Sequence, residues 1–274
     1  MPDCNHDCSS CNKSCNEREI EKLKPHQNTT IKKIIAVVSG KGGVGKSLTT
    51  SLLAVNARRE NKEVALMDAD ITGPSIPTIF GINEMAIGNE NTIFPVYSKT
   101  GIKTISLNEL TEDKADPVIW RGPVIANLIE QFFSNVDYGE VDELYIDMPP
   151  GTGDVPLTVF QSIPVDGIII VTSPQDLVSL IVEKALRMAK MMNVPVIGLV
   201  SNLSYCQCPH CGEKIYPFGK SNIEELCQKY DIKNIDYLPI DPNLASLCDK
   251  GRIESYQGRY LSNISKAINE LKKN

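Results

Sequence analysis

Short apolar runs, separated by polar or turn residues, dominate the chain from Ile31 onward. Six of these runs are rich in Ile and Val and hardly alternate with polar residues: Ile34–Val38, Val64–Met67, Ile102–Leu107, Leu144–Ile146, Ile168–Val171 and Val196–Val200. Such runs are typical of strands buried on both faces of a parallel sheet. Residues 31–274 are therefore expected to form one α/β domain.

Segments with helical character lie between and after these runs: Ser47–Arg59, Val124–Phe133, Leu177–Met192 and Asn222–Tyr230. The alternation predicts a doubly wound, mostly parallel sheet flanked by helices, with right-handed crossovers. Apolar residues within Tyr260–Leu271 also recur at helical spacing. That apolar face has no bulky aromatic residues, which favours a helix docked on the sheet over a membrane-targeting helix.

Residues 1–30 differ in character: they are polar, contain four cysteines and show no sustained apolar period. We interpret them as a tail whose order has to come from a bound metal or a partner. No apolar run approaches the roughly 18–20 residues that span a bilayer, and the N-terminus lacks the pattern of a secretory signal. The expected location is therefore the cytoplasm, with no membrane partner.

Charge narrows the choice of partners. Lys and Arg total 28 against 34 Asp and Glu, which gives a net charge of −6. Proteins that wrap nucleic acid usually show the opposite balance, because contacts to phosphates dominate that affinity. The composition therefore argues against DNA or RNA as the main partner.

Residues 40–47 match the phosphate-binding pattern G-x-x-x-x-G-K-[ST], between a predicted strand and a predicted helix. In such a P-loop, backbone N–H groups and the helix N-terminus face the phosphates. Lys46 is expected to neutralise the β and γ phosphates, and the Ser47 hydroxyl to ligate Mg²⁺. The sequence thus predicts binding and hydrolysis of ATP. The expected nucleotide-binding residues of the loop are Gly40, Lys41, Gly42, Gly43, Val44, Gly45, Lys46 and Ser47.

The second lysine of the loop, Lys41, resembles the signature lysine of the "deviant Walker A" family of dimeric ATPases, which includes MinD, ParA and the nitrogenase iron protein. The resemblance implies that Lys41 reaches the partner's ATP, that Asp70 positions or activates the attacking water, and that Asp147 holds the Mg²⁺ shell. Lys41, Lys46 and Asp70 are thus the expected catalytic residues. Asn202 occupies the position where relatives read adenine, although a turn residue is an equal alternative.

Nine cysteines in a reducing compartment are read as metal ligands or as small buried side chains rather than disulfides. Cys208 and Cys211 form a C-x-x-C, which points two thiolates at one metal centre. A structural zinc ion or a four-iron cluster needs four ligands. Three sources of the missing ligands stay open at this point: Cys206 with His210, the distant Cys227 and Cys248, or the same motif of a second subunit.

Several segments in combination resemble the Mrp/ApbC-type iron–sulfur cluster carrier ATPases. They are residues 39–47, 68–77 (Asp-Ala-Asp-Ile-Thr-Gly-Pro-Ser-Ile-Pro), 120–123 (Trp-Arg-Gly-Pro), 147–154 (Asp-Met-Pro-Pro-Gly-Thr-Gly-Asp) and 208–211 (Cys-Pro-His-Cys). The resemblance implies a slow ATPase that is a homodimer, with one [4Fe-4S] cluster bridged by two C-x-x-C pairs. The cluster would pass to iron–sulfur apoproteins, with cluster-assembly scaffolds as further partners. The family gives no role to Cys206.

The tail carries its own cysteine group: Cys4, Cys8, Cys11 and Cys15 are spaced C-x3-C-x2-C-x3-C. Eukaryotic relatives have a longer-spaced N-terminal four-cysteine site. An iron–sulfur cluster is the first interpretation, zinc the second and a metal-free tail the third.

Two other functions fit parts of the pattern. One is a MinD/ParA-like spatial-organising ATPase with a structural zinc site, and the other is a zinc-stabilised regulatory ATPase. Cys208 and Cys211 favour the cluster carrier, whereas the acidic composition counts against an organiser that binds DNA or membrane.

Overall fold

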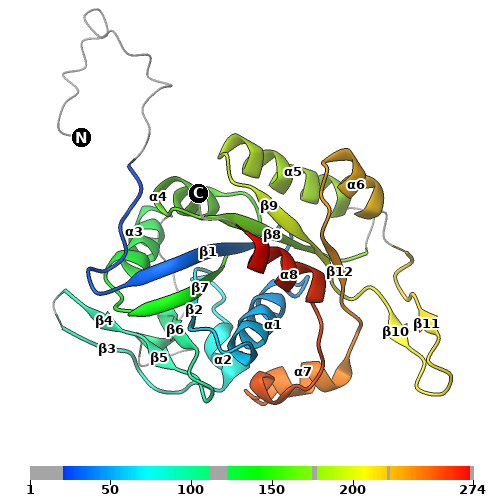
Figure 1. The fold of residues 1–274 in the computed structure, drawn as a ribbon, viewed down its shortest axis with the longest axis horizontal. Helices are drawn as coiled ribbons and strands as arrows, with labels where there is room; N and C mark the ends of the chain where they lie inside the picture. Colours follow the sequence, from blue (N-terminus) through cyan, green and yellow to red (C-terminus); the bar gives the residue numbers. More distant parts are fainter. Residues whose placement is uncertain (1–20, 90, 112–121, 175–177, 221–222, 272–274) are drawn as a thin grey trace, which may run out of the picture.

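The computed structural model describes residues 21–89, 91–111, 122–174, 178–220 and 223–271 (Figure 1). Its central element is an eight-stranded sheet in the order β12-β9-β8-β1-β7-β2-β6-β5. Every pairing in this sheet is parallel except that of β5 with β6. The strands are β1 (Thr30–Ser39), β2 (Val64–Asp68), β5 (Val96–Tyr97), β6 (Lys103–Ile105), β7 (Glu140–Asp147), β8 (Gly167–Thr172), β9 (Val196–Ser201) and β12 (Ile235–Tyr237).

Helices cover both faces of this sheet. The helices are α1 (Lys46–Arg59), α2 (Ile76–Phe80), α3 (Gly122–Ser134), α4 (Asp154–Ser162), α5 (Val178–Met191), α6 (Ile223–Lys229), α7 (Pro242–Asp249) and α8 (Ser262–Glu270). Buried side chains of α3, α4, α5 and α6 form one core with one face of the strands, and those of α1, α2, α7 and α8 form a second core with the other face. Figure 1 shows the two groups of helices on opposite sides of the sheet.

Strand β1 shows why runs of apolar residues that do not alternate with polar ones form the central strands. Ala36 and Val38 belong to the first core, whereas Ile35 and Val37 belong to the second. Successive side chains of a strand point to opposite faces, so a strand covered on both faces needs apolar residues at every position. The predicted fold, a doubly wound sheet flanked by helices, is confirmed.

The C-terminal amphipathic segment is a helix docked on the sheet, as expected. Ile264 of α8 is fully buried, and a Cβ atom added to Gly198 of β9 would lie 2.4 Å from its Cδ1 atom. Glycine at that strand position therefore lets the helix approach closely. Among the described residues, no helix is both long enough and apolar enough to cross a bilayer.

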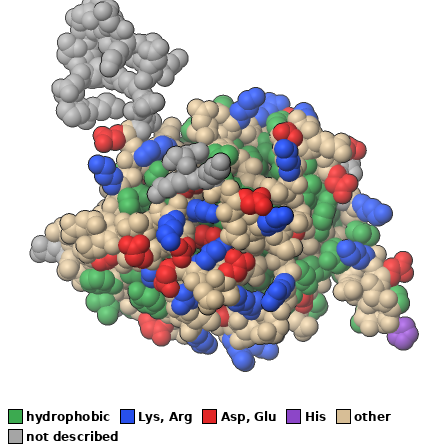
Figure 2. Space-filling model, viewed as in Figure 1, with side chains coloured by type: hydrophobic (Ala, Val, Ile, Leu, Met, Phe, Trp, Pro, Cys, Tyr) green, Lys and Arg blue, Asp and Glu red, His purple; other side chains and the backbone are tan. Residues whose placement is uncertain are grey.

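The apolar run Ile102–Leu107 was expected to be one strand, but β6 covers only Lys103–Ile105 and a 3₁₀ helix (Leu107–Glu109) follows it. Two small hairpins stand outside the main sheet: β3 (Ile87–Gly88) with β4 (Ile93–Phe94), and β10 (Cys206–Gln207) with β11 (Lys214–Ile215). The second hairpin projects from one end of the molecule in Figures 1 and 2. Figure 2 also shows acidic and basic side chains interspersed over this face.

The segment before β1 is attached to the domain. The backbone N–H of Leu23 donates to the carbonyl of Ser162 at the end of α4, and His26 is buried. Asn28 donates to the carboxylate of Asp137 over 3.0 Å. The four tail cysteines lie outside the described residues, and the boundary at residue 30 stays a prediction.

Candidate nucleotide site and cysteine hairpin

The carboxyl ends of the central strands bring the predicted nucleotide-site residues together. Asp147 at the end of β7 pairs in register with Val37 of β1 on one side and with Asp68 of β2 on the other. The P-loop follows β1 directly and leads into α1. Ligands of open parallel sheets bind outside the carboxyl ends of the strands, so this edge is the candidate nucleotide site.

The P-loop backbone depends on glycine at two positions. Gly43 and Gly45 adopt φ values of +77° and +83°, which side chains with a Cβ rarely allow. At Gly45 a second restriction applies, because a Cβ atom there would lie 2.0 Å from Nδ2 of Asn202. This loop shape leaves the N-terminus of α1 accessible to a phosphate.

Lys46 and Ser47 converge on Asp147. The Lys46 Nζ atom lies 2.8 Å from Oδ2 of Asp147, and the Ser47 hydroxyl donates to the same oxygen over 2.6 Å. The hydroxyl of Thr50, one turn further along α1, donates to Oδ1 over 2.8 Å. Asp147 is fully buried, so these three donors stabilise a charge that water does not reach.

Asp70 lies at the edge of the same group. Its Oδ2 atom is 3.7 Å from the Nζ atom of Lys46, and the residue is half-buried. Burial is the main cause that raises its pKa, and the charge of Lys46 opposes that shift. A half-buried carboxylate beside the P-loop lysine is suitably placed to contact a water molecule near the terminal phosphate.

Sequence reasoning missed Asp68, which is fully buried behind Asp70. One of its oxygens accepts hydrogen bonds from the backbone of Ser75 and Ile76 at the start of α2, and from the Ser106 hydroxyl. Burial, followed by the nearby charge of Asp147, raises its pKa well above the usual range. Its position at the end of an apolar run, like that of Asp147, was the signal that could have identified it.

Lys41 and Asn202 occupy different parts of the loop. Lys41 is exposed, and its carbonyl accepts a hydrogen bond from the Ser39 hydroxyl. Asn202 is buried, and its amide donates to the carbonyl of Val44 over 2.9 Å. Asn202 therefore contacts the P-loop itself, and its role toward adenine stays a prediction.

The C-x-x-C motif lies on the turn of the β10–β11 hairpin. The N–H of Cys208 donates to the carbonyl of Glu213, and the N–H of Gly212 donates to the carbonyl of Cys208, both over 2.9 Å. Gly212 has a φ of +77°, which allows this tight turn. Hydrogen bonds from the backbone of Cys211, and then of His210, lower the pKa of the Cys208 thiol. A lower pKa favours the thiolate, which is the form of cysteine that can bind a metal.

Cys227 and Cys248 lie on helices outside this hairpin. Cys227 is buried on α6 and Cys248 half-buried on α7, as expected for small apolar side chains. Within the described parts of the chain, no three His, Cys, Asp or Glu side chains are grouped to hold a metal ion. Cys206 and His210 therefore do not complete the Cys208–Cys211 pair in this arrangement.

Some residues that the sequence assigned to functional segments lie outside the described residues. Cys4, Cys8, Cys11 and Cys15 precede the described residues, and Trp120 and Arg121 lie in the undescribed range 112–121.

The model of a P-loop NTPase family described as NUBPL iron-transfer matches residues 30–274. Among curated proteins, the iron-sulfur cluster carrier protein of Clostridium perfringens is 43% identical over 259 residues, which cover 91% of this chain and 90% of that protein. The iron-sulfur cluster transfer protein NUBPL of Mus musculus is 38% identical, over 86% of this chain and 73% of its own.

Solved structures agree with the sequence comparisons. A nucleotide-binding protein from Archaeoglobus fulgidus, in complex with ADP, has a TM-score of 0.75 and 43% identity over 83% of this chain and 90% of its own. A chain of the MinC:MinD cell division protein complex of Aquifex aeolicus has a TM-score of 0.64 at 17% identity, covering 87% of this chain and 95% of its own, a likeness of fold alone. The match to the family model and the identity to curated relatives extend over most of the chain. The chain therefore belongs to the NUBPL-type iron-transfer P-loop NTPases.

Proposed function

We propose that the protein is a slow, Mg²⁺-dependent ATPase that carries [4Fe-4S] clusters and transfers them to apoproteins, as a homodimer in the cytoplasm. The observation that carries this proposal is the exposed C-x-x-C turn, which offers two thiols and no third ligand among the described residues. Two-fold symmetry is the commonest way in which a homo-oligomer completes such a half-site. The names of the relatives support iron–sulfur clusters as the cargo.

The P-loop is the proposed binding site for Mg-ATP. The hydroxyl of Ser47 and the carboxylate of Asp147 meet over 2.6 Å, and hard oxygen donors of this kind suit Mg²⁺. The Nζ atom of Lys46 contacts the carboxylates of Asp70 and Asp147. When ATP binds, Lys46 would turn from them toward the β and γ phosphates, which would take their place as its negatively charged partners. The ADP complex of the Archaeoglobus fulgidus relative supports nucleotide binding by this chain.

Hydrolysis needs a positioned water and a positive charge near the terminal phosphate. Asp70 is the proposed group that positions the water. Lys41 is proposed to supply the charge to the ATP of the other subunit, for which its exposure makes it suitable.

The cluster-binding part is proposed to consist of Cys208 and Cys211 from each of two subunits. A [4Fe-4S] cluster takes four cysteine thiolates, so each subunit contributes half of the ligand set. The turn geometry that lowers the pKa of Cys208 favours the deprotonated ligand. The tail cysteines would form a second, separate metal site, with iron–sulfur ahead of zinc.

The proposal is tested by anaerobic reconstitution of a variant that lacks residues 1–20, which removes the tail cysteines from the count. Iron, sulfide and zinc analysis, absorption spectra and sedimentation should show one [4Fe-4S] cluster per dimer. Cys208→Ala or Cys211→Ala should abolish it without changing nucleotide binding, whereas Cys227→Ala is the matched control.

Two results would contradict the proposal. A stable full cluster on a monomer would exclude the bridged site and redirect attention to Cys206 and His210. Stoichiometric zinc with no iron would favour a structural site, as in a regulatory or spatial-organising ATPase.

A further inference from the structure

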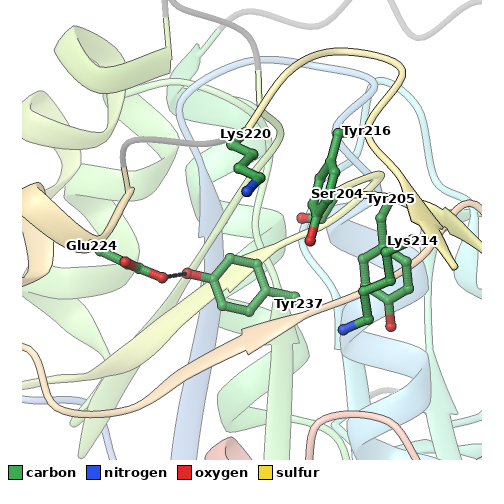
Figure 3. A pocket seen from close by; sticks show the side chains of 7 residues that line it. All are labelled: Ser204, Tyr205, Lys214, Tyr216, Lys220, Glu224 and Tyr237. Carbon is green, nitrogen blue, oxygen red and sulfur yellow. Dashed lines mark hydrogen bonds between the residues drawn. The ribbon is translucent and has the colours of Figure 1, made fainter.

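A cavity of about 390 Å³ lies at the base of the β10–β11 hairpin. Its walls come from the segment that enters the hairpin, from the segment that leaves it, from α6 and from β12 (Figure 3). Its lining includes Tyr205, Lys214, Tyr216, Lys220 and Tyr237. The cavity is separate from the P-loop residues described above, and the C-x-x-C turn lies at the tip of the same hairpin.

Two lysines give the cavity a positive character. The Lys214 Nζ atom lies 4.3 Å from the ring centre of Tyr205, and the Lys220 Nζ atom 5.4 Å from that of Tyr216. Neither amine forms an ion pair with a carboxylate of the described residues. Glu224 also lines the cavity and accepts a hydrogen bond from the Tyr237 hydroxyl over 3.0 Å, so the lining carries two amines and one carboxylate.

The polar groups converge on one space. Figure 3 shows the Lys220 amine and the Tyr216 hydroxyl directed into the space above the ring of Tyr237. An ammonium and a phenol hydroxyl both donate hydrogen bonds, and the ring beneath them is apolar. A carboxylate with a short aliphatic stem, such as a Glu or Asp side chain, matches this combination of groups.

The surroundings indicate a polypeptide as the carrier of that carboxylate. Ile215 and Phe218 belong to the same stretch of chain as the lining residues Lys214, Tyr216 and Lys220, and they are 54% and 48% exposed, so this stretch also presents apolar surface. A free small carboxylate would fill the cavity and leave this surface in water, whereas a peptide would cover both. Paired charge and apolar contact is the usual composition of a docking site.

We propose that this cavity, together with the exposed Ile215 and Phe218 of the same stretch of chain, is a docking site for an acidic segment of a partner protein. The inference rests on the proposed function in one respect: it places the partner next to Cys208 and Cys211, where a cluster would be exchanged. The acidic character of the partner, however, follows from the cavity alone.

The test uses the full chain, reduced and free of metal, so that its outcome does not depend on cluster binding. The probe is a fluorescein-labelled peptide of alternating Glu and Phe, and anisotropy measures its binding at low and high salt. Lys220→Gln should weaken binding about tenfold, since a charge-assisted hydrogen bond is lost. Lys214→Gln and Tyr216→Phe should weaken it less.

Lys266→Gln is the matched control, because it removes the same charge from an exposed site on α8. The control should bind the probe as the wild type does. Equal binding by the wild type and Lys220→Gln, or no binding of the probe, would overturn the proposal. So would equal affinity for the same peptide with Gln in place of Glu.

Two further results would identify another occupant and overturn the proposal as well. Displacement of the probe by free glutarate at equal concentrations would indicate a small-molecule carboxylate. Loss of the dimer in sedimentation of cluster-loaded Lys214→Gln or Lys220→Gln, where the cluster-loaded wild type is a dimer, would indicate a second copy of the chain.

Discussion

The side-chain nitrogen of Lys46 lies 2.8 Å from Oδ2 of Asp147, and both residues are buried at the carboxyl edge of the sheet. A buried charge that loses its counter-charge is expensive. The pair therefore contributes to the fold of the protein as well as to its predicted chemistry.

Lys46→Ala should lose nucleotide binding and turnover, because the phosphates lose their main counter-charge. The free energy of unfolding should also fall by about 3 kcal/mol, since Asp147 is left with hydroxyl donors only. Titration with a fluorescent ATP analogue and urea denaturation measure the two effects. Lys32→Ala, which breaks a surface ion pair with Asp142, is the control and should leave the free energy of unfolding nearly unchanged. Unchanged nucleotide binding in Lys46→Ala would contradict the assignment.

Lys41→Ala should reduce hydrolysis by about a hundredfold or more while leaving binding nearly intact, because its proposed charge acts in the transition state. Mixing Lys41→Ala with Lys46→Ala subunits should restore activity, because one site of each mixed dimer then has both lysines. Failure of the mixture to exceed either variant alone would argue against a lysine that acts across the interface.

Gly45→Ala should destabilise the protein through two separable effects. Backbone strain at φ +83° costs about 1–3 kcal/mol, and the new Cβ also displaces the Asn202 amide. Gly139→Ala is the control for strain alone, because its φ is +62° and no atom lies within 4 Å of the added Cβ. Denaturation curves should show a larger loss for Gly45→Ala, and Asn202→Ala in the same chain should remove most of the difference. Equal losses for the two alanine variants would exclude the clash.

Alkylation of the helical cysteines should depend steeply on pH. Burial raises the pKa of Cys227 and of Cys248 to about 11 in each case. Only the thiolate reacts, so both should resist iodoacetamide at pH 7.5 in the folded protein and react faster as the pH approaches 11. The unfolded chain ionises at lower pH, so raising the pH toward 11 also lowers stability at these sites. Peptide mass spectrometry reads each site, and rapid labelling of folded Cys227 at pH 7.5 would refute its burial.

Removing residues 1–20 should leave the ATPase domain folded, because the apolar pattern that predicts the domain begins only at Ile31. Metal content should fall by the amount held at Cys4, Cys8, Cys11 and Cys15. Circular dichroism and metal analysis of the truncated chain provide the measurements. An unfolded product, or an unchanged metal content, would contradict the tail assignment.

The sheet could be predicted because a strand that is buried on both faces needs a continuous run of apolar residues, and such a run is visible in the sequence. Every residue of Val64–Met67 is buried, and the run itself is wholly apolar. Ile102–Leu107 contains three polar residues, Lys103, Thr104 and Ser106, and the chain turns into a 3₁₀ helix at Leu107, a turn that nothing in the hydrophobic pattern specifies.

The candidate site was predictable where a motif fixes the spacing of its residues, as in the P-loop. It was not predictable where contacts join distant segments. The contact between Asn202 and the carbonyl of Val44 spans 158 residues, and the closeness of Asp68 to Asp147 depends on strand order. The strands on either side of the turn that holds Cys208 and Cys211 are two residues each, too short for a periodic signal.

The link between Asn202 and Cys208 limits how the two predicted centres can move relative to each other. Only five residues separate Asn202, whose amide touches Val44, from Cys208, the first cysteine of the turn, so the six residue steps between them span at most about 21 Å. Part of that tether is fixed, since Ser204 and Tyr205 form backbone hydrogen bonds with the segment after β12. The free length is shorter still and begins after Tyr205. The cysteine turn can pivot about this point, but it cannot travel away from the P-loop as an independent arm.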